Sequence, residues 1–292
     1  SQTAGGNGGS GICVIAYEDT YDEPSSITGT YSEPTRSGYR VYKFTGSGTI
    51  EWGSSGSFSN TYSAAFDDTT DKMYDSRNTT PWAVGTGAFS VSFWAKIASS
   101  TTGGAAMVVF RSSTAYLDGF TFYMGTSGDY MTTNGFWCSV DSTNTGWYGG
   151  DEWSTGTWHH IVFTRSGSTL TTYVDGSSIG TETVGSGSVD GGTGYGINIG
   201  QDPQHSGGYL DGNIDEVAFF TQALTASQVT NLYKGEENGG SGGTNGTPGD
   251  LADWGAGITA WYRMGDDTSI TTDSQGSYDL TNSGATTDED VP

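Results

Sequence analysis

The stretch from residue 134 to residue 153 holds the densest group of side chains that could bind a ligand. Its sequence, NGFWCSVDSTNTGWYGGDEW, places aromatic residues beside short polar ones, and Trp147 and Tyr148 lie between glycines. Carbohydrate binding needs an aromatic surface against the sugar and a few polar groups that read its hydroxyls. Aromatic residues in loops are better functional candidates than those in a core. The candidate sugar contacts are Trp147, Tyr148, Trp153, Asp141, Asn144 and Asp151. Subunit contact and burial in the domain core are alternative roles for these aromatics.

A run of acidic residues could hold a cation. The segment FDDTTDKMYD carries aspartates at turn-like spacing, and Asp211 follows in YLDGNIDE. Hard cations such as Ca²⁺ are held by carboxylates together with loop carbonyls. The candidate calcium ligands are therefore Asp67, Asp68 and Asp71, and a solvated acidic turn is the alternative explanation.

No group of residues has the arrangement that catalysis requires. Asp215 and Glu216 are adjacent in NIDEVAFF, and His159 and His160 are adjacent in TWHHIVF. Neighbouring residues in a strand point to opposite faces, so neither pair can serve one reaction centre or one metal. We expect structural roles for all four, with Asp215 bonded to the backbone, and we predict no catalytic residue.

The overall charge excludes some partners. The formal net charge is -23 and the pI is near 4.1, so the surface repels phosphate backbones and anionic membranes. No apolar run is long enough to span a bilayer. The negative charge either provides solubility or, where carboxylates cluster, binds cations. The two cysteines, Cys13 and Cys138, do not make a disulfide framework, and we expect both to be buried or half-buried thiols.

The composition favours strands. The chain contains 48 glycines, and 17 Tyr, 12 Phe and 9 Trp supply most of the bulk available for a core. From Phe58 to Lys234, short apolar or alternating segments are separated by Gly, Ser, Asp and Asn, which is typical of an all-β antiparallel sandwich. One short helix is predicted at Thr225–Lys234, with Thr225 as N-cap and Gln228 completing a capping box.

Four parts follow along the chain. Residues 1–53 form a Gly-rich N-terminal β module, 58–234 the main body, 235–257 a Gly-rich linker, and 258–292 a C-terminal extension. The extension is too short to bury a core alone. It either begins a second domain, or its strand adds to a sheet edge of its own domain or of a neighbouring subunit. The candidate assembly strand is Trp261, Tyr262, Arg263 and Met264.

Four pieces of the main body, in order, resemble the concanavalin A-like, laminin G-type jelly-roll family. They are YSAAFDDTTDKM, FSVSFWAKI, GTWHHIVFTRSGSTLTTYVDGSSIGT and YLDGNIDEVAFFTQALTASQVTNLY. The resemblance implies a jelly-roll β-sandwich over 58–234, and relatives of this fold often hold calcium near the rims of their sheets. It also implies that the extension is the start of a second jelly roll or a segment that completes this one. Glucanase relatives carry a Glu-x-Asp-x-x-Glu motif that this chain lacks.

Both ends of the chain resemble parts of phage structural proteins. GGSGICVIAYE and GYRVYKFTGSGTIEW are similar to the end of Gly-rich modules in tail and fibre proteins, and ITAWYRMGDD is similar to segments that precede jelly rolls in marine phage proteins. The resemblance implies a non-enzymatic protein on the virion surface that associates with its own copies and other virion proteins and binds host glycans. A secreted bacterial adhesin or filament subunit is the alternative, and a glycoside hydrolase is a third, lacking its carboxylate pair.

Overall fold

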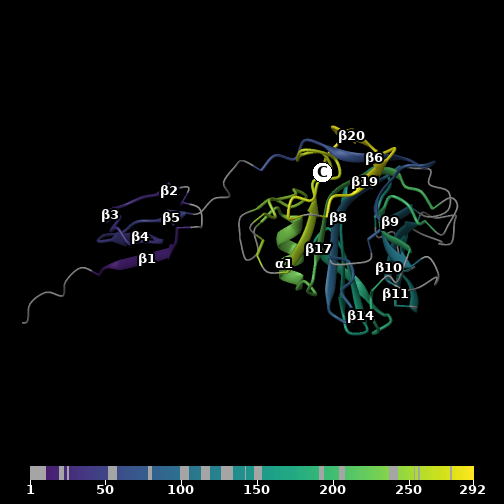
Figure 1. The fold of residues 1–292 in the computed structure, drawn as a ribbon, viewed down its shortest axis with the longest axis horizontal. Coiled ribbons are helices and arrows are strands. Elements are labelled where there is room, and N and C mark those ends of the chain that lie inside the picture. The colour runs from purple at the N-terminus through teal and green to yellow at the C-terminus, as the bar shows by residue number, and fades with distance from the viewer. Residues whose placement is uncertain are drawn as a thin grey trace, which may run out of the picture. The chain divides into compact units, whose positions relative to one another are not determined.

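The computed structural model describes most of the chain and divides it into two compact units, residues 1–58 and 59–292. The described residues are 11–19, 23–24, 26–51, 58–77, 81–98, 105–112, 119–125, 134–141, 143–147, 153–190, 194–203, 208–236, 243–252, 254–255, 257–276 and 278–292. Each unit is an antiparallel β structure with its own sheets (Figure 1).

The N-terminal unit contains a three-stranded sheet and a two-stranded one. The first has the order β1 (Cys13–Glu18), β4 (Tyr39–Phe44), β3 (Tyr31–Ser32), and the second pairs β2 (Ser26–Ile27) with β5 (Ile50–Glu51). Tyr42 and Phe44 are its buried aromatics, and the ring of Tyr17 stacks on Tyr42 with centroids 6.2 Å apart. These strands belong to the separate compact unit of residues 1–58.

The second unit is a jelly-roll sandwich of two antiparallel sheets. The seven-stranded sheet has the order β12 (Thr143–Trp147), β11 (Gly135–Val140), β10 (Gly119–Gly125), β9 (Ala105–Ser112), β16 (Gly194–Ile199), β7 (Lys72–Asp75), β19 (Thr281–Ser283). The eight-stranded sheet has the order β15 (Ser177–Thr183), β14 (Thr169–Val174), β13 (His159–Ser166), β8 (Phe89–Ile97), β17 (Asp211–Phe220), β6 (Ser63–Asp67), β20 (Thr286–Asp288), and β18 (Ile258–Tyr262) also pairs with β17. The all-β jelly-roll fold class predicted from the sequence is confirmed.

Aromatic rings from both sheets fill the space between them. Phe122 of β10 and Phe163 of β13 stack with centroids 4.1 Å apart and planes within 2°. Phe89 of β8 and Phe120 of β10 make a second stacked pair at 5.2 Å. Offset or stacked rings contribute beyond their buried area, so these pairs tie the two layers together.

One helix, α1 (Ala226–Tyr233), lies on the outer side of the eight-stranded sheet (Figure 1). The predicted capping box is confirmed, because the Thr225 side chain accepts from the Gln228 backbone N–H and the Gln228 side chain accepts from the Thr225 N–H. Tyr233 at the end of the helix stacks on Trp94 of β8 at 5.8 Å. The helix therefore covers part of the outer face of that sheet.

The C-terminal segment belongs to the jelly roll, which extends beyond the boundary predicted at Lys234 to residue 292. Strands β18, β19 and β20 pair with β17, β7 and β6 respectively, and Leu251 and Trp254 before them are buried. The sequence left open whether this segment starts a second domain or completes a sheet. In the structure it adds strands to both sheets of its own chain, because its apolar residues need a core that a short segment cannot make alone.

Candidate functional site

The outer side of the seven-stranded sheet carries polar and aromatic side chains. Along β10, Phe120 and Phe122 face the core, while Thr121 and Tyr123 alternate to the outside. Neighbouring strands contribute outward residues in the same way. We call this set the seven-stranded face: Val109, Arg111, Thr121, Tyr123, Trp137, Ser139 and Asn198.

An aromatic pair lies on the seven-stranded face. Trp137 of β11 is the cross-strand partner of Tyr123 of β10, and their rings meet edge to face with centroids 5.4 Å apart. Trp137 is half-buried, and Tyr123 is 9% exposed. Trp137 therefore combines a ring fixed in orientation with some exposed surface, which is what stacking on a sugar requires.

A buried ion pair fixes this aromatic pair. Arg111 Nη1 lies 3.0 Å from Asp202 Oδ2, and the guanidinium also donates to Thr121 Oγ1 from Nη2 at 2.8 Å. The Tyr123 hydroxyl donates to Asp202 Oδ2, the same oxygen that Arg111 Nη1 contacts. Arg111 is 1% exposed and Asp202 is not exposed at all. A buried ion pair costs desolvation that apolar residues would avoid, and this pair also holds the Tyr123 hydroxyl through Asp202.

Sequence reasoning did not find Arg111 and Asp202. They are 91 positions apart, and only the pairing of β9 with β16 brings them together. The one signal was the Arg at the end of the apolar segment AAMVVFR, because a charge in such a strand needs a buried partner.

The predicted sugar contacts have different positions. Trp153 packs in the core at 3% exposure and its Nε1 donates to the Gly135 carbonyl at 3.2 Å, so it cannot stack on a sugar here. Asp141 has a φ of 44°, and its Oδ2 accepts from the Gly187 N–H at 2.5 Å, which makes it a turn residue. Trp153 is therefore corrected to a structural role, whereas sugar contact by Asp141 stays a prediction.

For the other predicted sugar contacts, the structure describes at most the backbone. The backbones of Asn144 and Trp147 lie in β12, in register with Ser139 and Phe136 of β11. The side chains of both, and the whole of Tyr148 and Asp151, lie outside the described residues. Their role in sugar contact stays a prediction.

The candidate calcium ligands form an Asx turn. Asp67 Oδ1 accepts from the N–H groups of Thr69 at 3.0 Å and Thr70 at 3.3 Å, and Oδ2 accepts from the Thr69 hydroxyl at 2.6 Å. These hydrogen bonds, first those from Thr69, lower the pKa of Asp67, whereas burial and nearby carboxylates raise the pKa of Asp68 and Asp71. Among the described residues, no three His, Cys, Asp or Glu side chains converge as a metal ion would need. Calcium binding stays a prediction.

The candidate assembly strand pairs inside its own chain. Trp261 and Tyr262 are opposite Ala218 and Val217 of β17, and Tyr262 and Met264 belong to the main core. Trp261 Nε1 donates to Glu216, and the guanidinium of Arg263 lies over the Trp261 ring at 5.3 Å. In this structure Trp261 and Tyr262 extend the sheet of the same subunit, and Arg263 and Met264 follow the end of the strand.

The two adjacent acids sit at a bulge of β17. The register with β8 shifts between Asp215 and Ala218, and Glu216 has a φ of 50°, a left-handed conformation unusual for a non-glycine residue. Asp215 Oδ1 accepts from the Glu216 N–H at 2.8 Å, which confirms the predicted backbone bond, and Oδ2 accepts from Asn60 at 2.9 Å.

Burial dominates the ionisation of both acids. It raises the pKa of Glu216 to about 8, although Arg263 at 3.6 Å opposes the shift. Burial and then the charge of Glu216 raise the pKa of Asp215 well above its usual range. Both carboxyls accept hydrogen bonds from the protein's own donors, which is the arrangement of structural acids.

The adjacent histidines are held separately. His159 Nδ1 donates to Asp175 Oδ2 at 2.8 Å while its Nε2 accepts from the Ser154 N–H at 3.1 Å. His160 is 1% exposed, with Nε2 at 2.9 Å from the Ser92 hydroxyl, and burial lowers its pKa to about 3. The expected structural roles fit these contacts.

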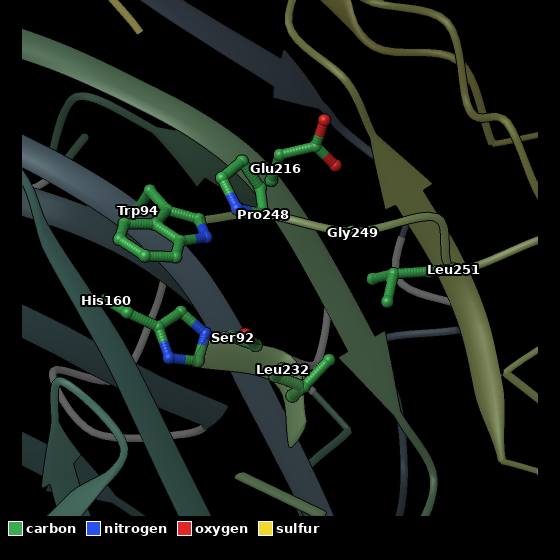
Figure 2. Close-up of a pocket in the computed structure, with 8 residues that line it drawn as sticks. All are labelled: Ser92, Trp94, His160, Glu216, Leu232, Pro248, Gly249 and Leu251. Atoms are coloured by element: carbon green, nitrogen blue, oxygen red, sulfur yellow. Dashed lines mark hydrogen bonds between the residues drawn. The ribbon is translucent and has the colours of Figure 1, made fainter. Parts of the chain in front are cut away.

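Figure 2 shows the small cavity beside His160. Residues from β8 and β13 line one side, and Leu232 of α1 together with Pro248, Gly249 and Leu251 line the other. Its volume of about 10 Å³ is at the lower limit for one water molecule. The outer face of the eight-stranded sheet is thus filled at this point by the protein itself.

The two cysteines differ. Cys138 is buried in the core and burial raises the pKa of its thiol, as expected for an inert residue. Cys13 is exposed, which corrects the expectation that it is buried. Within the described part of the chain, no helix is long and apolar enough to cross a membrane.

Comparisons with solved structures give the same fold. A candidate carbohydrate-binding protein from Bacteroides ovatus aligns over 95% of this chain and 86% of its own, at 13% identity and a TM-score of 0.60. A heptameric SAP-like pentraxin from Limulus polyphemus aligns over 80% and 96%, at 16% identity and a TM-score of 0.47. The CBM40 of a Ruminococcus gnavus sialidase bound to sialyllactose aligns over 56% and 92%, at 12% identity and a TM-score of 0.44.

At sequence identities this low, the comparison with the first structure supports a shared fold and nothing more. No curated protein matches the chain in sequence. A laminin G-type family model matches residues 67–230, more than half of the chain and most of both sheets. The chain therefore belongs to the concanavalin A-like lectin/glucanases superfamily.

Proposed function

We propose that this chain is a non-enzymatic glycan-binding protein whose seven-stranded face contacts the sugar. The observation that carries the proposal is the half-buried Trp137 ring, held edge to face against Tyr123, which is itself fixed by Asp202 and Arg111. A ring fixed beside buried polar groups offers stacking with little loss of conformational entropy on binding. The Bacteroides ovatus protein, of the same fold, is named for carbohydrate binding.

The absence of catalysis is part of the proposal. It rests on the missing Glu-x-Asp-x-x-Glu motif and on the engagement of Asp215 and Glu216 with backbone, Asn60 and Trp261. Incubation of the chain with each bound glycan tests this point. Release of reducing ends would contradict it.

Glycan binding is tested with an array of bacterial surface polysaccharides and the full chain. We expect Trp137→Ala to abolish binding and Trp137→Phe to retain part of it, because Phe keeps a stacking ring. Tyr62→Ala is the matched control, since Tyr62 is an exposed aromatic elsewhere on the jelly roll. Equal binding by Trp137→Ala and the unaltered chain would overturn the proposed face.

Calcium dependence is a separate proposal, for the rim that holds Asp67, Asp68 and Asp71. The same array is run with Ca²⁺ and with chelator. Because Asp67 already accepts three hydrogen bonds, a bound ion would have to displace some of them. Identical binding in both buffers would remove calcium from the proposal and leave the sugar face standing.

We further propose that the protein is displayed on a virion. The resemblance of both chain ends to phage structural segments supports this role over that of a secreted adhesin, which would use the same sugar face. Proteomics and immunogold labelling of purified phage particles test it. Finding the protein only on bacterial surfaces or in culture medium would favour the adhesin.

A further inference from the structure

The positive charges of the jelly roll bear on which class of glycan it can take. All 10 lysines and arginines of the chain lie among the described residues. Anionic groups on a sugar are usually held by such charges, because an anion that leaves water without a counter-charge loses solvation free energy. The cations of the jelly roll are Lys72, Arg77, Lys96, Arg111, Arg165, Lys234 and Arg263, and the remaining ones belong to the N-terminal unit.

Most of these cations are already bound to oxygen atoms of the same chain. Arg165 is not exposed, and it donates to the carbonyls of Gly185 and Gly187 at 3.0 and 2.8 Å. Four others pair with carboxylates: Arg77 with Asp75, Lys96 with Asp290, Arg111 with Asp202, and Arg263 with Glu216. An anionic ligand would have to displace a partner that the fold already supplies at each of these positions.

The strands that present Trp137 carry no lysine or arginine of their own. Between Arg111 and Arg165 the sequence has neither residue, and this stretch includes β10, β11 and β12. Of its two histidines, His160 is 1% exposed and His159 is bonded within the chain at both ring nitrogens. The acidic residues of the stretch are Asp118, Asp129, Asp141, Asp151 and Glu152. An anionic sugar on Trp137 would therefore find no free positive charge on these strands.

The two remaining cations, Lys72 and Lys234, form no ion pair with a described residue. Lys234 follows α1, which covers the other sheet. Lys72 points to the outer side of β7, since its neighbour Met73 faces the core, and its ammonium lies 5.4 Å from the centre of the Tyr74 ring. Strands β16, β9 and β10 separate β7 from β11, so Lys72 is about 19 Å across the sheet from Trp137. This separation exceeds the screening length of about 10 Å at 0.1 M salt.

We propose that the glycan bound at Trp137 is uncharged, and that the jelly roll discriminates against sugars that carry carboxylate, sulfate or phosphate groups. The inference rests on the proposed function, because it names the class of ligand for the same site. An uncharged sugar needs only the ring of Trp137 and hydrogen-bonding groups. An anionic sugar would in addition be repelled by a chain whose net charge is -23.

A matched pair of ligands tests the inference by calorimetry with the full chain. The first is an uncharged polysaccharide that the chain binds, and the second is the same polysaccharide with its primary hydroxyls oxidised to carboxylates. We expect the oxidised form to bind about tenfold more weakly at low salt, and the difference to narrow in about 0.5 M NaCl, because salt screens the repulsion. Binding of the uncharged form should stay within about twofold over the same range.

Two results of this comparison would contradict the inference. Equal or tighter binding of the oxidised form, with Ca²⁺ or with chelator, would show that the site accepts anionic sugars. A loss of binding that salt does not narrow would come from a missing hydroxyl contact and not from charge.

Lysine variants test whether a cation takes part in binding. Lys72→Gln should leave the affinity for the uncharged polysaccharide within about twofold, because the lysine lies more than a screening length from Trp137. Lys234→Gln is the matched control, since it removes the same charge from the other side of the sandwich. Loss of binding in Lys72→Gln alone would show that a cation of the seven-stranded sheet contacts the ligand, and would overturn the inference.

Trp137→Ala separates this inference from the proposed function. An acidic glycan that the unaltered chain binds and Trp137→Ala does not would overturn the inference and leave the proposed face standing. If no polysaccharide of either class binds through Trp137, the proposed function fails and the inference fails with it.

Discussion

The outer faces of the two sheets are built from the same alternating strands, yet they are covered by different chemistry. On the eight-stranded sheet, Trp94 stacks on Tyr233 of α1, and Phe220 meets Trp254 edge to face at 6.0 Å. On the seven-stranded sheet, the buried groups are a guanidinium, a carboxylate and a phenol that bond to one another. The first face is sealed by apolar packing, and the second is held in place by polar contacts next to the half-buried Trp137.

The two faces therefore differ in what holds their side chains rather than in how deeply these are buried, since Arg111 and Thr121 of the seven-stranded face are 1% and 2% exposed. An apolar seal stabilises the fold and leaves only a cavity of about 10 Å³. A buried polar network stabilises less for its size, but it fixes the direction of the groups that it contains. Each of the following changes tests this contrast between a sealed face and an organised one.

The largest effect is expected from Trp94→Ala. Trp94 is 3% exposed and its ring contacts both His160 and Tyr233, so truncation should lower the free energy of unfolding by about 3–5 kcal/mol. Trp137→Ala, on the other face, should cost only about 1–2 kcal/mol because Trp137 is only partly buried. Urea unfolding measures both, and equal losses would mean that the two faces are sealed alike.

The next effect separates positioning from stability at the buried ion pair. Asp202→Asn leaves the Arg111 charge buried without its counter-charge and should cost about 3 kcal/mol. The double variant Arg111→Met/Asp202→Leu should regain most of that stability in urea unfolding, while glycan binding stays lost because Tyr123 is no longer held. A double variant that binds glycan normally would assign the pair to stability alone.

The sequence predicted the sandwich because its strands alternate over short, turn-bounded segments, and the helix because Thr225 and Gln228 are a local signal. It could not say which outer face is covered, since the outward residues of β8 and β10 are equally mixed in type. Trp153 was misassigned because it was grouped with the other aromatics of one polar, Gly-rich stretch, whereas its burial depends on the distant strands that surround it. Arg111 and Asp202 were missed for the same reason: their contact exists only after β9 and β16 pair.

A smaller effect is expected in the pH dependence of stability. Because the folded pKa of Glu216, about 8, lies above that of the unfolded chain, the folded state holds a proton that the unfolded state releases. Stability should therefore fall as pH rises from about 4.5 to about 8. Glu216→Gln removes this contribution and should flatten the fall in unfolding free energy across that window. An unchanged slope would mean that Glu216 is ionised throughout.

On the acid side the sign is opposite for His160. Its folded pKa of about 3 lies below the unfolded value of about 6.5, so stability should be lost as pH falls through that range. His160→Gln should reduce this acid loss while leaving the slope above pH 7 unchanged. In the pH profile of stability, Glu216→Gln therefore reports on the β17 bulge above pH 4.5, and His160→Gln reports on the apolar-sealed face at acid pH.

The smallest effect is expected at the start of α1. Thr225→Ala removes the side chain that accepts from the Gln228 N–H, at a cost of about 1 kcal/mol, whereas Thr225→Ser keeps the acceptor and should be nearly neutral. Hydrogen exchange should accelerate in α1 and in the amides of β8 beneath it, but not in β10 of the other sheet. Tyr233 of α1 forms part of the apolar packing over the outer face of the eight-stranded sheet. Exchange that accelerates only in α1 and β8 would therefore show that this covering layer unfolds locally while the sandwich stays folded. Acceleration spread equally over both sheets would instead make α1 part of one cooperative core, and the contrast between the two faces would then be one of chemistry only.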